Sequence, residues 1–151
     1  FARVRGYVDR AQRERIGMLG RSARPDDLPA GGFYVEPMVF GPVPEPHELA
    51  REEVFGPVLA ALPFDDEHDA IRLANATPYG LVAGVWTENG SRQTRVARAM
   101  RAGQVFINCY GAGGGIELPF GGFKRSGHGR GKGFAAMLEF STLQTITQKY
   151  A

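Results

Sequence analysis

Residues 111–133, GAGGGIELPFGGFKRSGHGRGKG, hold ten glycines, four Lys or Arg side chains and one histidine. Glycine-rich loops bind phosphates when their spacing places backbone N–H groups around the anion. The G-x-G-x-x-G fingerprint fails twice, because Ile116 and Lys132 stand where its last glycine belongs. The P-loop spacing that starts at Gly122 carries His128 in place of the required lysine. The sequence therefore argues against a phosphate cradle of either kind.

Two other interpretations of this stretch remain open on composition. One is a solvated loop that turns tightly against other backbone. The other is an RNA-binding segment, in which Arg125, Arg130 and Lys132 contact phosphates while Phe123 and Phe134 stack on bases. We favour the loop, because much of the stretch before Phe123 is apolar.

No isolated side chain settles the chemistry either. The three histidines, His47, His68 and His128, lie too far apart to predict a metal site. Cys109 is the only cysteine and has no histidine nearby in sequence, so a small buried hydrophobe is favoured over a nucleophile. The pair Glu52–Glu53 precedes an apolar run. It fits a surface pair as well as a carboxylate that accepts hydrogen bonds from ribose hydroxyls.

The composition is that of a globular protein with a sizeable core. The chain has 151 residues, of which 43% are apolar and 23% charged. A net charge of +2 is too small to predict a nucleic-acid or membrane partner. One cysteine excludes an intrachain disulfide and suits a reducing compartment, which we expect to be the cytoplasm. The first residue is Phe1, so we expect a piece of a longer protein.

The elements that must position these residues alternate between strands and helices. A buried strand is predicted within 52–64, a helix capped by Asp65 or Asp66, and a buried strand over 81–87. A second helix follows, capped by Ser91 and ended by Gly103, and then a strand over 104–108. This order predicts right-handed crossovers and a parallel sheet, hence an α/β fold.

The two ends of the chain add further elements. Residues 1–19 have the apolar spacing of an amphipathic helix. Pro37 within 32–40 predicts an edge strand or an irregular extended segment. Residues 133–141 are expected to form a short helix, and 142–150 a terminal strand that is a free edge or pairs with a neighbour.

Five motifs follow one another along the chain: GGFYVEPMVF, REEVFGPVLAALPF, LANATPYGLVAGVWT, AGQVFIN and LPFGGFKRSGHGRGKG. Their order resembles the aldehyde dehydrogenase superfamily over essentially the whole chain. The resemblance implies the second half of the catalytic domain over 1–140, followed by an oligomerisation strand over 141–151. It also implies oxidation of an aldehyde to a carboxylic acid with NAD or NADP, through a cysteine thiolate and hydride transfer to the nicotinamide. The family's Rossmann-like domain does without the usual glycine fingerprint.

The family's E-x-F-G-P motif falls on Glu53, Phe55, Gly56 and Pro57. The resemblance implies that Glu53 bonds the nicotinamide ribose and that Phe55 packs beside it, so both are expected to bind the cofactor. It implies that Phe120 lines the substrate tunnel. Residues 108–118 resemble the variable loop at the tunnel mouth.

Two departures from the family pattern matter. Where the family often has Arg-Glu-x-Gly, this chain has Gly131 after Arg130, which removes a local ion pair. The resemblance also places the nucleophilic cysteine, the general-base glutamate and the dinucleotide domain before Phe1, and it gives Cys109 no such role. We therefore expect these residues alone to contain no catalytic residue, to be inactive, and to self-associate or bind the missing part. The alternative is an interaction module that co-assembles with full-length dehydrogenases.

Overall fold

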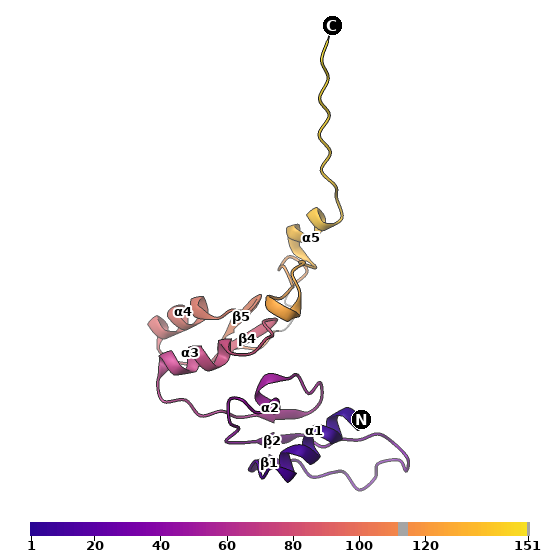
Figure 1. The fold of residues 1–151 in the computed structure, drawn as a ribbon, viewed down its shortest axis with the longest axis vertical. Helices are drawn as coiled ribbons and strands as arrows, with labels where there is room; N and C mark the ends of the chain where they lie inside the picture. The colour runs from indigo at the N-terminus through magenta and orange to yellow at the C-terminus, as the bar shows by residue number, and fades with distance from the viewer. Residues whose placement is uncertain (112–114, 151) are drawn as a thin grey trace. The chain divides into compact units, whose positions relative to one another are not determined.

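The computed structural model describes residues 1–111 and 115–150. The chain divides into two compact units, Phe1–Thr77 and the residues from Pro78 onward. Each unit has its own sheet (Figure 1).

The first unit combines a three-stranded sheet with helices. In the sheet, β2 lies between β1 and β3, pairing antiparallel with β1 and parallel with β3. The elements in chain order are α1 (Ala2–Arg13), β1 (Met18–Arg21), β2 (Met38–Phe40), α2 (Glu48–Arg51), β3 (Val58–Ala60) and α3 (Glu67–Asn75).

The core of this unit forms where α1 packs against the sheet. Val4, Tyr7, Val8 and Ala11 recur at the spacing of one helix face, and all four are buried. They share a cluster with β2 and with the segment that follows it, and in Figure 1 α1 runs beside β1 and β2. The remaining members of the cluster are Met38, Phe40, Val43, Leu49 and Val54.

Three features of this unit differ from the sequence predictions. The first helix ends at Arg13 instead of continuing to residue 19, and Arg15 adopts a left-handed φ of 60°. The strand β1 follows at once. Its four residues are all exposed, and they lack the alternation of apolar and polar residues that predicts a half-buried strand. Finally, β2 is a central strand, not an edge strand, because Pro37 lies just outside the ladder and removes no donor from it.

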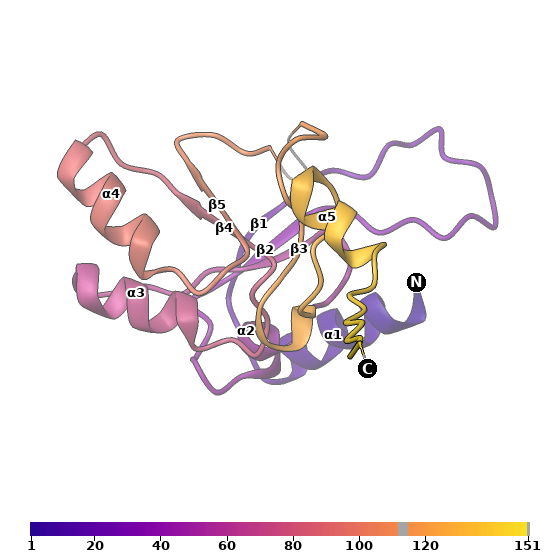
Figure 2. The ribbon, with the colours of Figure 1, turned by 90° about the horizontal axis from the view of Figure 1, so that it is seen from above.

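The second unit repeats the strand–helix–strand pattern. Its elements are β4 (Val82–Val85), α4 (Gly90–Ala99), β5 (Gln104–Ile107), the 3₁₀ turn η1 (Lys124–Ser126) and α5 (Gly133–Glu139). β4 and β5 pair in parallel, and Figure 2 shows α4 running alongside them. The predicted crossover is thus confirmed, although β3 belongs to the first sheet and not to this one.

The helix ends confirm one predicted cap and correct two other predictions. Asp66 caps α3, and its Oδ1 accepts a hydrogen bond of 2.8 Å from the Asp69 amide. The cap of α4 is Asn89 and not Ser91, since Asn89 Oδ1 accepts from the Arg92 amide at 2.9 Å. Gly103 lies beyond the end of α4 and has no left-handed φ. A Cβ there would lie 1.7 Å from the Gly121 carbonyl oxygen, so close backbone contact is what requires glycine.

Two predicted strands are less buried than their sequences indicate, and one is not formed. Leu59 in β3 is 66% exposed, and Trp86 after β4 is 70% exposed, because no described element covers these side chains. Residues 141–150 are exposed and form no ladder with any described residue. A strand needs a partner to satisfy its backbone groups, so the terminal strand stays a prediction.

Candidate functional site

Glu53 and Phe55 lie on the segment that joins α2 to β3. His47 caps α2 by accepting a hydrogen bond of 3.1 Å from the Leu49 amide at its Nδ1. The helix ends at Arg51, and Glu52 then takes an extended conformation. The chain therefore leaves the helix extended, and neighbouring side chains alternate between two sides.

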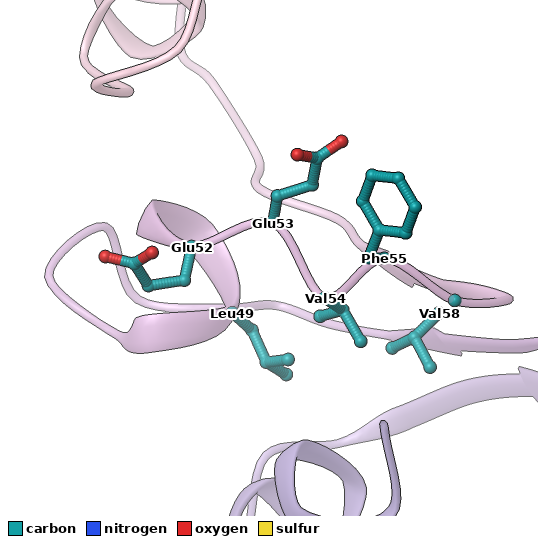
Figure 3. A pocket seen from close by; sticks show the side chains of 7 residues that line it. Leu49, Glu52, Glu53, Val54, Phe55 and Val58 are labelled. Atoms are coloured by element: carbon teal, nitrogen blue, oxygen red, sulfur yellow. The ribbon is translucent and has the colours of Figure 1, made fainter. Parts of the chain in front are cut away.

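This alternation separates the core from a surface pocket. Val54 and Leu49 are buried in the core cluster, whereas Glu53 and Phe55 are exposed. Figure 3 shows the Glu53 carboxylate and the Phe55 ring on one side of the segment and Val54 on the other. An open pocket of about 460 Å³ is lined here by Leu49, Glu52, Glu53, Val54, Phe55, Gly56 and Val58.

Backbone geometry fixes the turn that follows the carboxylate. Phe55 has φ 58°, a left-handed conformation that costs a non-glycine residue about 1–2 kcal/mol. A Cβ at Gly56 would lie 2.6 Å from Val4 Cγ2 of α1. The Gly56 carbonyl then accepts from the Val58 amide at 2.8 Å, at the start of β3. The glycine is thus required by contact with α1, and the strained residue is the aromatic beside it.

The Glu53 carboxylate is available for a ligand. Within residues 1–111 and 115–150, no side chain or backbone donor contacts it, and its side chain is exposed at the pocket. A carboxylate accepts hydrogen bonds at both oxygens, so it matches a pair of neighbouring hydroxyl donors. The Phe55 ring, 81% exposed on the same side, offers an apolar face to a flat group. An acceptor for two hydroxyls beside an apolar ring could hold the ribose and ring of a nicotinamide nucleotide.

Phe120 lies in the second unit, whereas Glu53 and Phe55 lie in the first. Its backbone forms an antiparallel bridge with Gly131, with N···O distances of 2.7 and 2.8 Å. Its ring is half-buried, and Lys132 Nζ lies 5.9 Å from the ring centroid. Part of the predicted variable loop, residues 112–114, lies outside the described residues.

The basic glycine-rich turn is held together by its own backbone. Arg130 Nη1 donates to the carbonyl oxygens of Gly122, His128 and Gly129 at 2.9–3.1 Å. Its guanidinium also lies 5.3 Å from the centroid of the Phe123 ring. A Cβ at Gly121 would lie 2.2 Å from the Gly129 carbonyl oxygen. These contacts support the tight-loop interpretation and leave the Arg130 cation engaged within the turn.

Cys109 follows β5 and is exposed, which corrects the prediction of a buried side chain. The neighbouring Asn108 has φ 51°, and its side chain bonds the Thr87 amide and carbonyl at 2.8 and 2.9 Å. No sequence signal predicted this link between the ends of β4 and β5. The contact from Arg3, whose Nη2 donates to the Glu53 carbonyl at 2.5 Å, was not predicted either. Sequence spacing gave no signal for it, because the two residues are 50 positions apart.

Comparison with known proteins identifies the family to which the chain belongs. The sequence profile of the aldehyde dehydrogenase family matches residues 1–146. The chain belongs to this family. An aldehyde dehydrogenase structure from Mycobacterium tuberculosis, solved in complex with NAD+, matches with a TM-score of 0.84 and 38% identity, over 92% of this chain and 28% of that one. The resemblance and the α/β class predicted from the sequence are confirmed.

Two further relatives show how much of a dehydrogenase the chain represents. The betaine aldehyde dehydrogenase of Rhizobium leguminosarum bv. trifolii (strain WSM2304) is 39% identical over 144 residues, which are 95% of this chain and 29% of that protein. A structure assigned as an aldehyde dehydrogenase from Burkholderia cenocepacia matches with a TM-score of 0.90 and 57% identity, over 96% of this chain and 30% of that one. The chain thus spans less than a third of the length of these dehydrogenases.

The described residues add two negative observations. No helix among them is long and apolar enough to cross a membrane. They also contain no group of three or more His, Cys, Asp or Glu side chains that could hold a metal ion.

Proposed function

We propose that this chain supplies the C-terminal part of the catalytic domain of an NAD(P)-dependent aldehyde dehydrogenase, which oxidises an aldehyde to a carboxylic acid. Membership of the family supports the reaction class. The NAD+ bound to the Mycobacterium tuberculosis relative supports the cofactor class. The cytoplasmic location remains a prediction from the sequence.

The observation that carries this proposal is the unpartnered Glu53 carboxylate beside Phe55 at the pocket. Glu53 would accept hydrogen bonds from the nicotinamide ribose hydroxyls, and Phe55 would pack against the same nucleotide. A bound nicotinamide would supply the hydride acceptor. Holding the ribose limits the positions of the ring relative to the substrate, and orientation of this kind contributes strongly to rate. Both residues therefore orient the cofactor and are not acid–base groups.

We propose that Phe120 lines the channel that the aldehyde enters. A half-buried ring with a hydrogen-bonded backbone keeps a fixed position, which suits the wall of an aldehyde channel. Residues 108–118 would form the mouth of that channel. Phe120 would thus be one of the side chains that select the aldehyde.

We propose further that these 151 residues do not oxidise aldehydes by themselves, because the only cysteine, Cys109, follows β5 and no base among the described residues contacts it. Purified chain mixed with NAD+ and short aldehydes should produce no NADH. Activity that disappears in Cys109→Ala would contradict this assignment.

The Glu53 role is tested with nicotinamide mononucleotide, which carries the ribose without the adenine half. Titration of the chain, followed by amide NMR signals, should shift the signals of residues 53–56. Glu53→Gln should weaken binding roughly tenfold, because it removes a charge-assisted acceptor.

The matched control is Glu88→Gln, which removes the same charge from an exposed position outside the pocket. It should leave the affinity unchanged. Equal losses in both variants, or shifts spread evenly over the chain, would overturn the assignment of Glu53.

We also propose that the chain assembles with itself or with the remainder of the dehydrogenase through residues 142–150. These residues are exposed and have no ladder partner among the described residues. Leu143 and Ile146 are 102% and 82% exposed, and neighbouring apolar side chains this exposed are typical of surfaces that another protein covers.

A further inference from the structure

One face of α1 carries three stacked side chains that reach toward residues 48–53, the segment that leads to Glu53. Arg3, Tyr7 and Arg10 are spaced by four and three residues, so they lie on one face over two turns. The guanidinium carbons of Arg3 and Arg10 lie 5.7 and 4.7 Å from the centroid of the Tyr7 ring. Tyr7 is only 8% exposed, so this ring is a fixed platform for both cations.

The two arginines contact opposite ends of the segment that carries Glu53. Arg10 Nε donates to the Glu48 carboxylate at the start of α2. This hydrogen bond is the main cause that raises the pKa of Arg10 above its ordinary value. Arg3 Nη2 donates to the main-chain carbonyl of Glu53 at 2.5 Å. The helix therefore holds residues 48–53 at both ends.

The same helix also contacts the chain after Phe55. Val4 lies against Gly56, on the far side of the left-handed Phe55. Arg3 and Val4 are consecutive, so the first turn of α1 contacts the chain immediately before and immediately after Val54 and Phe55. The direction in which Glu53 and Phe55 leave the backbone is thus set by α1.

We propose that Arg3 is a positioning residue for the Glu53 site: its bond to the Glu53 carbonyl holds the carboxylate toward the pocket and keeps Phe55 in its left-handed conformation. The proposal rests on the proposed function for the role of Glu53 in binding ribose. Arg3 itself acts through the main chain and need not touch the ligand.

The experiment uses the full 151-residue chain with Arg3→Met, Arg3→Lys and a matched control, Arg5→Met. Arg5 lies on the same helix and is exposed, and its side chain has no hydrogen bond, ion pair or ring contact with a described residue. Each variant is titrated with nicotinamide mononucleotide. In each, the three-bond HN–Hα coupling of Phe55 and the amide exchange of residues 53–56 are measured by NMR, alongside Tm.

Arg3→Met should change the Phe55 coupling and speed exchange at residues 53–56, and it should weaken nucleotide binding by roughly three- to fivefold. Arg3→Lys, which can still donate to the carbonyl, should restore most of the loss. Arg5→Met should match the wild type in every measurement. Tm of the two methionine variants should be similar, which separates local positioning from general stability.

The outcomes distinguish the two proposals. If Arg3→Met leaves the Phe55 coupling and local exchange as in Arg5→Met, the positioning role is wrong. If those signals change but the nucleotide binds none of the proteins, the proposed function of Glu53 is wrong while the role of Arg3 in local geometry holds. If Arg3→Met lowers Tm far more than Arg5→Met and Arg3→Lys gives no rescue, Arg3 is a general structural residue and the proposal fails.

Discussion

Phe55 and Gly56 show why a short motif can combine an aromatic residue with a glycine. The aromatic takes the left-handed φ, although glycine would take it without strain. The glycine has an ordinary φ but lies against Val4, where a side chain has no room. The ring is thus placed at the pocket by a strained backbone, and the residue after it is small because a helix passes there.

Gly56→Ala is expected to destabilise the first unit by about 1–3 kcal/mol, because the added methyl overlaps the buried Val4 side chain. Urea unfolding followed by circular dichroism measures the loss. Gly20→Ala is the matched control, since a Cβ at Gly20 meets nothing within 4 Å. In the Val4→Ala background the Gly56→Ala penalty should shrink. A penalty of the same size in both backgrounds would mean that the overlap with Val4 is not its cause.

At the scale of elements, sequence reasoning succeeded where the signal is local. The apolar face of α1 and the Asp66 cap are written within one or two turns, and both are present. It failed where two local signals compete, and where the deciding contact comes from a distant part of the sequence. Ser91 and Asn89 are both good caps, and the observed helix starts two residues before the predicted start, at Gly90. The position of β2 in its sheet depends on β1, a strand whose residues carry no apolar pattern.

The same division applies to the candidate site. The Glu53 and Phe55 pair could be proposed from its motif, whereas the contact from Arg3 required the fold, since it crosses from α1 to the segment before β3. The burial of Cys109 and of the strands near Leu59 and Trp86 was overpredicted, because an apolar sequence indicates a covered surface but not what covers it.

Asp66→Ala is expected to lower the stability of the chain by about 1 kcal/mol through loss of the α3 cap. Asp65→Ala removes a neighbouring carboxylate that has no cap contact and should change stability much less. Thermal unfolding of the two variants gives the comparison. Equal effects would point to the charge of this acidic turn and not to the cap.

At the scale of the whole molecule, the exposed apolar surface is the main physical problem. The chain spans 29% of the length of its Rhizobium leguminosarum relative, and many of its large apolar side chains are exposed. In the second unit these include Trp86, Phe134, Met137, Leu138, Phe140, Leu143, Ile146 and Tyr150. Surfaces of this kind are normally covered by other protein. Assembly through residues 142–150 would cover part of this surface and pair their backbone groups.

If the assembly is strand pairing, it depends on backbone donors in the terminal segment. Successive N–H groups of an extended segment point to opposite edges, so proline at Gln144 or at Thr145 must remove a donor from whichever edge is paired. We expect at least one of Gln144→Pro and Thr145→Pro to weaken self-association by roughly tenfold. Light scattering over a concentration series measures this, with Gln144→Ala and Thr145→Ala as controls that keep the donors.

If both proline variants associate like their alanine controls while Ile146→Lys disperses the protein, apolar contact and not strand pairing holds the assembly together. A monodisperse monomer in the wild type at high concentration would contradict assembly altogether.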